Sequence, residues 1–108
     1  MNDVSVIGRF VKPIVVKDLG EEKYVINNVL AIPRKKKVEG QQQADFVPIV
    51  VWGNLAKLVE KYCQKGNLIG VSGRLNSRQY VTKEGKSMVV VEIIVNDIHL
   101  MEGKRYIE

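Results

Sequence analysis

The sequence predicts an all-β domain with one short helix, folded as a small five-stranded Greek-key barrel. Runs of β-branched residues recur along the chain between clusters of Gly, Pro, Asn and Asp, which is the pattern of strands and turns. Only one stretch has the 3.6-residue apolar period of an amphipathic helix. A chain of 108 residues, 45% of them hydrophobic, is long enough for one core and too short for two.

The first strand begins close to the N-terminus. The stretch VSVIGRFVKPIVV, residues 4–16, is rich in Val and Ile but contains Gly8 and Pro13. Glycine weakens a strand and often marks a bulge, and proline cannot donate a ladder hydrogen bond. We therefore expect a bend or bulge near Gly8 and an extended path that resumes after Pro13.

Two further strands follow before the helix. Residues 23–32 and 44–52 are largely apolar and β-branched, and the loop between them, residues 34–43, has no apolar periodicity. Pro48 lies inside the third strand, so that strand must be at a sheet edge or locally unpaired at this residue.

The single predicted helix lies within residues 54–66. Asn54 is a favourable N-cap, and Gly66 suits the position just after a helix. Helical spacing places five apolar residues on one stripe, which we expect to pack on the sheet: Leu55, Leu58, Val59, Tyr62 and Cys63. Cys63 is then a small buried hydrophobic residue.

Residues 67–81 and 88–101 complete the sheet as a β-hairpin around a short loop that contains Gly85. Three strands, one helix and two strands in this order are the layout of the OB-fold, a partly open barrel that binds oligonucleotides and oligosaccharides. Other small β-rich folds share parts of this order. We expect one OB-fold domain over residues 1–103 and a short tail over residues 104–108.

The composition disfavours an enzyme, a metalloprotein and a membrane protein. His99 is the only histidine and Cys63 the only cysteine, and no nucleophile–base pair, metal-ligand set or cofactor motif is recognisable. The chain has no apolar run that could span a bilayer and no secretion signal, so we expect a cytoplasmic protein. A net charge of +5 points to a polyanion as its partner, and to nucleic acid before a membrane surface.

Phe46 and Trp52 share one face of the third strand, and the opposite face is largely apolar as well. One of the two faces must belong to the core. Two interpretations of the rings stay open at this point. They are core aromatics, which is the commoner outcome, or they form an exposed platform on which unpaired bases stack.

Positive charge lies next to these rings. In GRLNSRQY, residues 73–80, alternation places Arg74, Arg78 and Tyr80 on the same face of a strand. Basic residues also occupy the loop before the aromatic strand and the hairpin loop: Arg34, Lys35, Lys36, Lys37, Lys83 and Lys86. A charge run in a loop is usually only solvated, but cations interleaved with rings suit the phosphates and bases of a single strand.

Six stretches occur in an order and spacing typical of one family: VIGRF, VLAIPR, ADFVPIVVWG, YCQKGNLIGVSGRL, NSRQYVTKEGK and VVVEIIVNDIHLME. Along nearly its whole length the chain resembles the bacterial single-stranded DNA-binding protein (SSB) family. The resemblance implies an OB-fold that assembles into a homotetramer and wraps single-stranded DNA without sequence preference. It also implies base stacking on Phe46, Trp52 and Tyr80, and basic contacts from Arg9, Lys65, Arg74 and Arg78.

Three departures from the family pattern matter. Lys36 replaces an aromatic residue that many members carry after the second strand, and Asn28 stands where an apolar or aromatic residue is common. Binding should therefore rely more on electrostatics, with an affinity that falls steeply with salt. The chain also ends at KRYIE, without the acidic tail through which members recruit partner proteins. It is a short accessory or mobile-element version or a trimmed chain; if it is complete, we expect no such recruitment.

The sequence thus predicts a sequence-independent single-stranded DNA-binding protein without catalytic activity or cofactors. It would protect single strands during replication, recombination or repair, in association with the nucleoid. Three alternatives stay open. A primosomal-type accessory OB protein would bind DNA more weakly together with a helicase-loading partner. A pure interaction module would use the aromatics as an oligomer interface, and a small hydrolase is disfavoured by the missing catalytic residues.

Overall fold

A computed structural model describes residues 1–35, 39–41 and 43–101 of the chain. The five predicted strands and the helix are confirmed, and the extended path after Pro13 adds one two-residue strand. In chain order the elements are β1 (Val4–Phe10), β2 (Lys17–Asp18), β3 (Tyr24–Pro33), β4 (Ala44–Trp52), α1 (Asn54–Tyr62), β5 (Leu68–Val81) and β6 (Ser87–Leu100).

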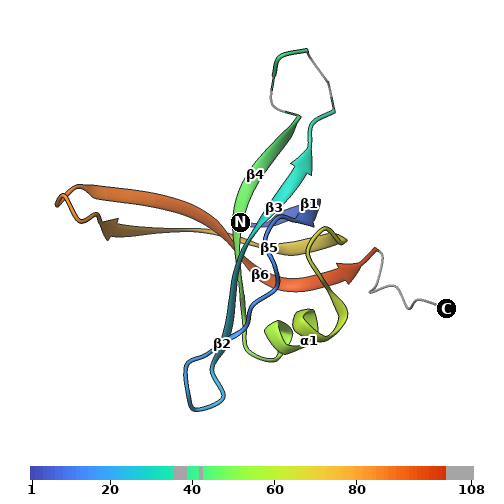
Figure 1. The fold of residues 1–108 in the computed structure, drawn as a ribbon, viewed down its shortest axis with the longest axis horizontal. Helices are drawn as coiled ribbons and strands as arrows, with labels where there is room; N and C mark the ends of the chain where they lie inside the picture. Colours follow the sequence, from blue (N-terminus) through green and yellow to red (C-terminus); the bar gives the residue numbers. More distant parts are fainter. Residues whose placement is uncertain (36–38, 42, 102–108) are drawn as a thin grey trace.

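Strand β1 closes the sheet into a barrel (Figure 1). The strands are hydrogen-bonded in the order β1-β5-β6-β4-β3-β2, and β1 also pairs with β3. The residues Val4–Arg9 of β1 pair with β5, and its last two residues pair with β3. β4 and β6 meet as a short parallel pair through Ile49 and Val50. This closed arrangement, with the helix between β4 and β5, is the predicted OB-fold.

Pro48 lies inside β4, which is a central strand of the sheet. β4 pairs with β3 along its full length, and Pro48 is opposite Val29 in that ladder. The pairing of β4 with β6 on its other side begins one residue later, at Ile49. The missing N–H of Pro48 therefore removes no bond from the β4–β6 ladder, so the edge alternative is wrong and the locally unpaired alternative fits.

Two glycines permit close backbone approach in the barrel wall. The bulge expected near Gly8 is absent there, because β1 pairs with β5 without a shift in register. A Cβ at Gly8 would lie 2.8 Å from the carbonyl oxygen of Ala31, so the glycine allows β1 to approach β3. The shift in register occurs between Ser72 and Gly73, and a Cβ at Gly73 would overlap the carbonyl oxygen of Ile94.

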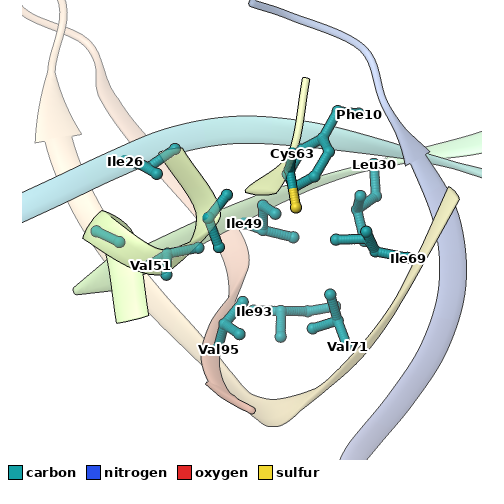
Figure 2. Close-up of a cluster of buried hydrophobic side chains, with 12 residues drawn as sticks. Phe10, Ile26, Leu30, Ile49, Val51, Cys63, Ile69, Val71, Ile93 and Val95 are labelled. Atoms are coloured by element: carbon teal, nitrogen blue, oxygen red, sulfur yellow. The ribbon is translucent and has the colours of Figure 1, made fainter. Parts of the chain in front are cut away.

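The core fills the interior of the barrel with side chains from the five long strands and the helical segment (Figure 2). Ala56 and Val59 of α1 belong to this cluster, so the helix covers one end of the barrel. Cys63 is buried there as predicted. The remaining members are Phe10, Ile26, Leu30, Ile49, Val51, Ile69, Val71, Ile93 and Val95.

The ends of α1 differ from the prediction. The N-cap is Gly53, and its φ of 68° with ψ of −142° is a conformation that essentially only glycine adopts. Asn54 is therefore the first helical residue, and the prediction of Asn54 as N-cap is wrong. The helix ends at Tyr62 because Cys63 is extended. Gly66, with a φ of 88°, lies in the turn that follows and does not end the helix.

The buried stripe of α1 is narrower than predicted. Val59 and Cys63 are buried, but Leu58 is 50% exposed, and Ala56 is buried in addition. Tyr62 is also exposed. Among the strands, α1 packs mainly on β3 and β4, so one narrow face of the helix is covered. The expectation that Leu58 and Tyr62 pack into the core is wrong.

The two longest hairpins, β3–β4 and β5–β6, extend from the barrel in different directions (Figure 1). In the described part of the chain, no helix is long and apolar enough to cross a membrane. β6 ends at Leu100, close to the predicted domain boundary at residue 103, and the predicted tail of residues 104–108 lies outside the described residues.

Candidate nucleic-acid interface

Alternation along β4 turns two aromatic rings outward. Ile49 and Val51 are buried in the core, whereas Phe46 and Trp52 on the opposite face are 54% and 49% exposed. The interpretation of these rings as core aromatics is therefore wrong. Two half-exposed rings on one strand form the kind of surface on which bases stack.

A groove of about 550 Å³ lies over the same face of the sheet. Trp52, Arg74 and Arg78, three of the residues predicted from the sequence, meet in this groove. Polar and charged side chains thus share one surface with apolar residues and an exposed ring. The full lining comes from four strands: Val25 and Asn27 of β3, Val50 and Trp52 of β4, Arg74, Asn76 and Arg78 of β5, and Glu92 and Ile94 of β6.

Arg78 is held in place inside the groove. Its Nε donates a hydrogen bond to Oε1 of Glu92 at 3.1 Å, and Asn76 Nδ2 donates to the other carboxylate oxygen at 3.3 Å. The side chain of Arg78 is 55% exposed, whereas that of Glu92 is only 5% exposed. A buried carboxylate therefore anchors a guanidinium that is open to solvent.

The β5–β6 hairpin carries further predicted residues beyond the groove. Tyr80 is 43% exposed and lies two residues from Arg78 on the same face of β5. Lys83 and Lys86 are exposed in the turn that joins the two strands. Arg74 lines the groove, and its side chain makes no ion pair or hydrogen bond with a described residue. The hairpin thus presents cations on both sides of an exposed ring.

One cation of the basic loop between β3 and β4 is already paired with a carboxylate. Arg34 donates from Nε and Nη2 to Oδ1 of Asp45 at 3.0 and 2.7 Å, so its charge is partly neutralised. Lys35 is exposed in this loop. The other two predicted cations of the loop, Lys36 and Lys37, lie outside the described residues.

Arg9 and Lys65 are not among the residues that line the groove. Arg9 Nη1 donates to the carbonyl oxygen of Gly66 at 2.9 Å, which ties β1 to the turn after α1. Lys65 is exposed in that same turn. The structure therefore brings these two residues together near the turn and does not place them beside Trp52.

Asn28 has a structural role. It is only 3% exposed, and its side chain faces the segment that follows β1. Asn28 Oδ1 accepts from the amide of Lys12 at 3.1 Å, and Nδ2 donates to the carbonyl of Lys12 at 3.0 Å. This pair of bonds fastens the segment before Pro13 to β3. Asn28 therefore stabilises the barrel wall.

Three polar residues of the site were absent from the predicted set: Asn27, Asn76 and Glu92. Asn76 shares the strand face of Arg74 and Arg78, so alternation could have identified it. Glu92 interrupts the apolar run VVVEIIV, and a lone charge in such a run is a usable signal. Asn27 had no comparable signal, because its exposure depends on the pairing of β3 with β4.

The fold and the groove together define the class of protein. An OB-fold with exposed rings and arginines on one open sheet face has the features of the oligonucleotide-binding members of this fold. Across residues 1–35, 39–41 and 43–101, no group of three or more His, Cys, Asp or Glu side chains could hold a metal ion.

Comparison with known proteins identifies the family. The model of the single-strand binding protein family matches residues 1–101. Single-stranded DNA-binding protein 3 of Clostridium acetobutylicum is 44% identical over 94% of this chain and 72% of its own length. Single-stranded DNA-binding protein B of Bacillus subtilis is 34% identical over 95% of this chain and 92% of its own length. The chain belongs to the single-strand binding protein family.

A solved structure supports the assignment of the fold. It is described as a Plasmodium falciparum SSB complex with ssDNA, and it matches this chain with a TM-score of 0.79 at 28% identity. The match covers 94% of this chain and 96% of that one. The likeness therefore extends over nearly the whole of both chains.

We expect the exposed rings to contribute little to folding. Phe46→Ala or Trp52→Ala should change the free energy of unfolding by less than about 1 kcal/mol, because each ring is about half exposed. Phe10, which is 2% exposed, is the control, and Phe10→Ala should cost about 3–5 kcal/mol. Urea unfolding followed by circular dichroism measures all three variants. An equally large loss at Phe46 would show that this ring supports the core.

Proposed function

We propose that this protein binds single-stranded DNA along the groove and the adjoining face of the β5–β6 hairpin, without sequence preference. The observation that carries the proposal is the meeting of Trp52, Arg74 and Arg78 in one groove. Membership of the single-strand binding protein family supports it, as does the likeness to an SSB solved with ssDNA.

Each class of side chain has a different partner on the strand. Phe46, Trp52 and Tyr80 stack on bases, and each stack is worth about 1–3 kcal/mol. Arg74 and Arg78 bind phosphates, whose oxygens match the fork of a guanidinium. Every base has a flat face, so stacking tolerates any sequence. A duplex keeps these faces inside its own stack, which makes the single strand the preferred ligand.

The other predicted cations are assigned to outer phosphate contacts and to long-range attraction of DNA: Arg9, Arg34, Lys35, Lys36, Lys37, Lys65, Lys83 and Lys86. We rank the described members of this set below Arg74 and Arg78 because they do not line the groove. Lys36 and Lys37 lie outside the described residues. Arg34 is also paired with Asp45, and Arg9 is hydrogen-bonded to Gly66. The net charge of +5 favours encounter with a polyanion whether or not these side chains contact DNA directly.

We further infer that the protein acts by binding alone, without catalysis. Its role is the protection of single strands exposed during replication, recombination or repair, and it therefore works at the nucleoid. The functional unit in this proposal is the domain of residues 1–103. The family assignment supports the binding role, because the relatives named above are DNA-binding proteins.

Assembly into a homotetramer is part of the proposal. The β5–β6 hairpin has a second face, opposite Arg78 and Tyr80, on which four aliphatic side chains are 46–69% exposed: Leu75, Val81, Val89 and Val91. Apolar surface of this kind commonly marks an interface between proteins. A second copy of the chain is the occupant that a homotetramer requires, and it would leave the DNA face of the hairpin open.

Stacking predicts a fluorescence signal on DNA binding. Oligo-dT should quench the emission of Trp52, the only tryptophan, and a duplex of equal length should scarcely do so. Phe46→Ala and Tyr80→Ala should each weaken binding by about 1–3 kcal/mol. Tyr62→Ala is the matched control, because Tyr62 is an exposed ring on α1 outside the groove lining. A folded protein whose fluorescence does not respond to oligo-dT would contradict the stacking model.

The affinity for oligo-dT should fall steeply with salt. The logarithm of the binding constant decreases by about 0.7 per decade of salt for each phosphate neutralised, so three or four contacts give a slope of about −2 to −3. Arg78→Gln should reduce this slope by about 0.7. Arg34→Gln is the control with a smaller expected change, because Arg34 is already paired with Asp45. A nearly flat titration would refute the electrostatic contribution.

Light scattering tests the tetramer. The expected mass is about four times the 12.2 kDa of one chain. Val89→Glu and Val91→Glu should lower this mass, because a charge in a closed apolar interface is costly. Leu19→Glu places the same charge on an aliphatic residue that is exposed outside the hairpin, and it should leave the mass unchanged. A wild-type mass of one chain would exclude the proposed assembly.

A further inference from the structure

Glu92 occupies a position that the proposed function alone does not explain. Of the described residues that line the groove, it is the one acid, and it is 4% exposed. It also lines an adjoining hollow of about 200 Å³ together with Lys12 and Arg78. Burying a carboxylate is costly, and a negative charge beneath a phosphate path repels the ligand. A compensating role is therefore expected.

The hydrogen bonds of Glu92 indicate what this role is. Arg78 donates from Nε to one carboxylate oxygen at 3.1 Å, and Asn76 Nδ2 donates to the other at 3.3 Å. Neither Nη group of Arg78 donates to a described residue. The guanidinium thus lies between a buried anion and the open groove, with its two Nη groups left for a ligand. Such a pair of N–H donors matches the oxygens of a phosphate.

We infer that Glu92 is a positioning residue for Arg78: it orders the guanidinium before DNA arrives, so that binding does not have to order it. The inference rests on the proposed function. Arg74 provides the contrast, because its side chain lines the same groove without a hydrogen-bond or ion-pair partner among the described residues. Immobilising a long side chain on binding costs about 0.5–1.5 kcal/mol, which corresponds to about 2- to 12-fold in affinity. Arg78 avoids this cost and Arg74 does not.

Charge and positioning predict opposite signs for one substitution. E92Q removes a negative charge near the phosphates, so electrostatics alone would tighten binding. Positioning predicts that E92Q weakens binding to oligo-dT by about 2- to 12-fold, because the hold on Arg78 is reduced. E92D keeps the charge but withdraws the carboxylate by one methylene group. It should also weaken binding under the positioning proposal, and it carries the test if E92Q does not fold.

A double-mutant cycle on the full chain isolates the coupling. The affinity for labelled oligo-dT is measured by anisotropy for wild type, R78Q, E92Q and R78Q/E92Q, with thermal unfolding as a check of the fold. R78Q should cost clearly less in the E92Q background than in the wild type. R74Q, the matched control, should cost the same in both. D97N removes one negative charge from an exposed residue outside the groove lining and should leave the affinity nearly unchanged.

The outcomes separate this inference from the proposed function. If R78Q weakens binding by the same factor in both backgrounds, and E92Q binds as tightly as wild type or more tightly, the positioning role of Glu92 is refuted while the groove remains the binding surface. If R78Q leaves the wild-type affinity unchanged, the groove is not the binding surface, and both proposals fail. Weaker binding by E92Q together with a reduced effect of R78Q in that background supports the positioning role.

Discussion

Closure of the barrel by β1 determines which face of the other long strands meets water. β1 pairs with β5 on one side and, through its last two residues, with β3 on the other. The approach to β3 depends on Gly8, where a side chain would collide with the backbone. Once the barrel is closed, Ile49 and Ile93 are sealed inside, and alternation forces Trp52 outward. The face that we propose as the DNA-binding surface is thus a consequence of how the core is enclosed.

Most of the fold could be predicted because each strand carries its own local signal. Alternation and turn residues located all five long strands, and β4 has the predicted bounds of residues 44–52. The ends of the helix could not be predicted in this way. Asn54 is a good N-cap in isolation. The observed N-cap is Gly53, in a conformation that essentially only glycine tolerates, so the helix begins at Asn54, one residue earlier than predicted. The extended backbone of Cys63, which ends the helix, has no signal in the apolar period, because a helical Cys63 would share the buried stripe of Val59.

The part of the candidate site that lies on a single strand could be predicted from the sequence. Arg74 and Arg78 follow from alternation along β5, and their meeting with Trp52 in the groove agrees with the expectation. The role of Glu92 depends instead on the register between β5 and β6. Its carboxylate reaches Arg78 because Glu92 of β6 is opposite Asn76 of β5. Such pairing between strands is not local information. The two interpretations of the aromatic rings stayed open for the same reason, since either face of β4 is apolar enough to be buried.

In the proposed DNA site, side chains that are ordered before binding contribute to affinity differently from side chains that the ligand must order. Rings on paired strands have few rotatable bonds, so stacking on Trp52 loses little entropy and is insensitive to salt. Lysines such as Lys83, on an exposed turn, must be ordered by the ligand and are screened by ions. Arg78 lies between these classes, because it is a cation but is held by a buried carboxylate. In the proposed site, the ordered contacts of the groove therefore supply the part of the affinity that depends least on salt.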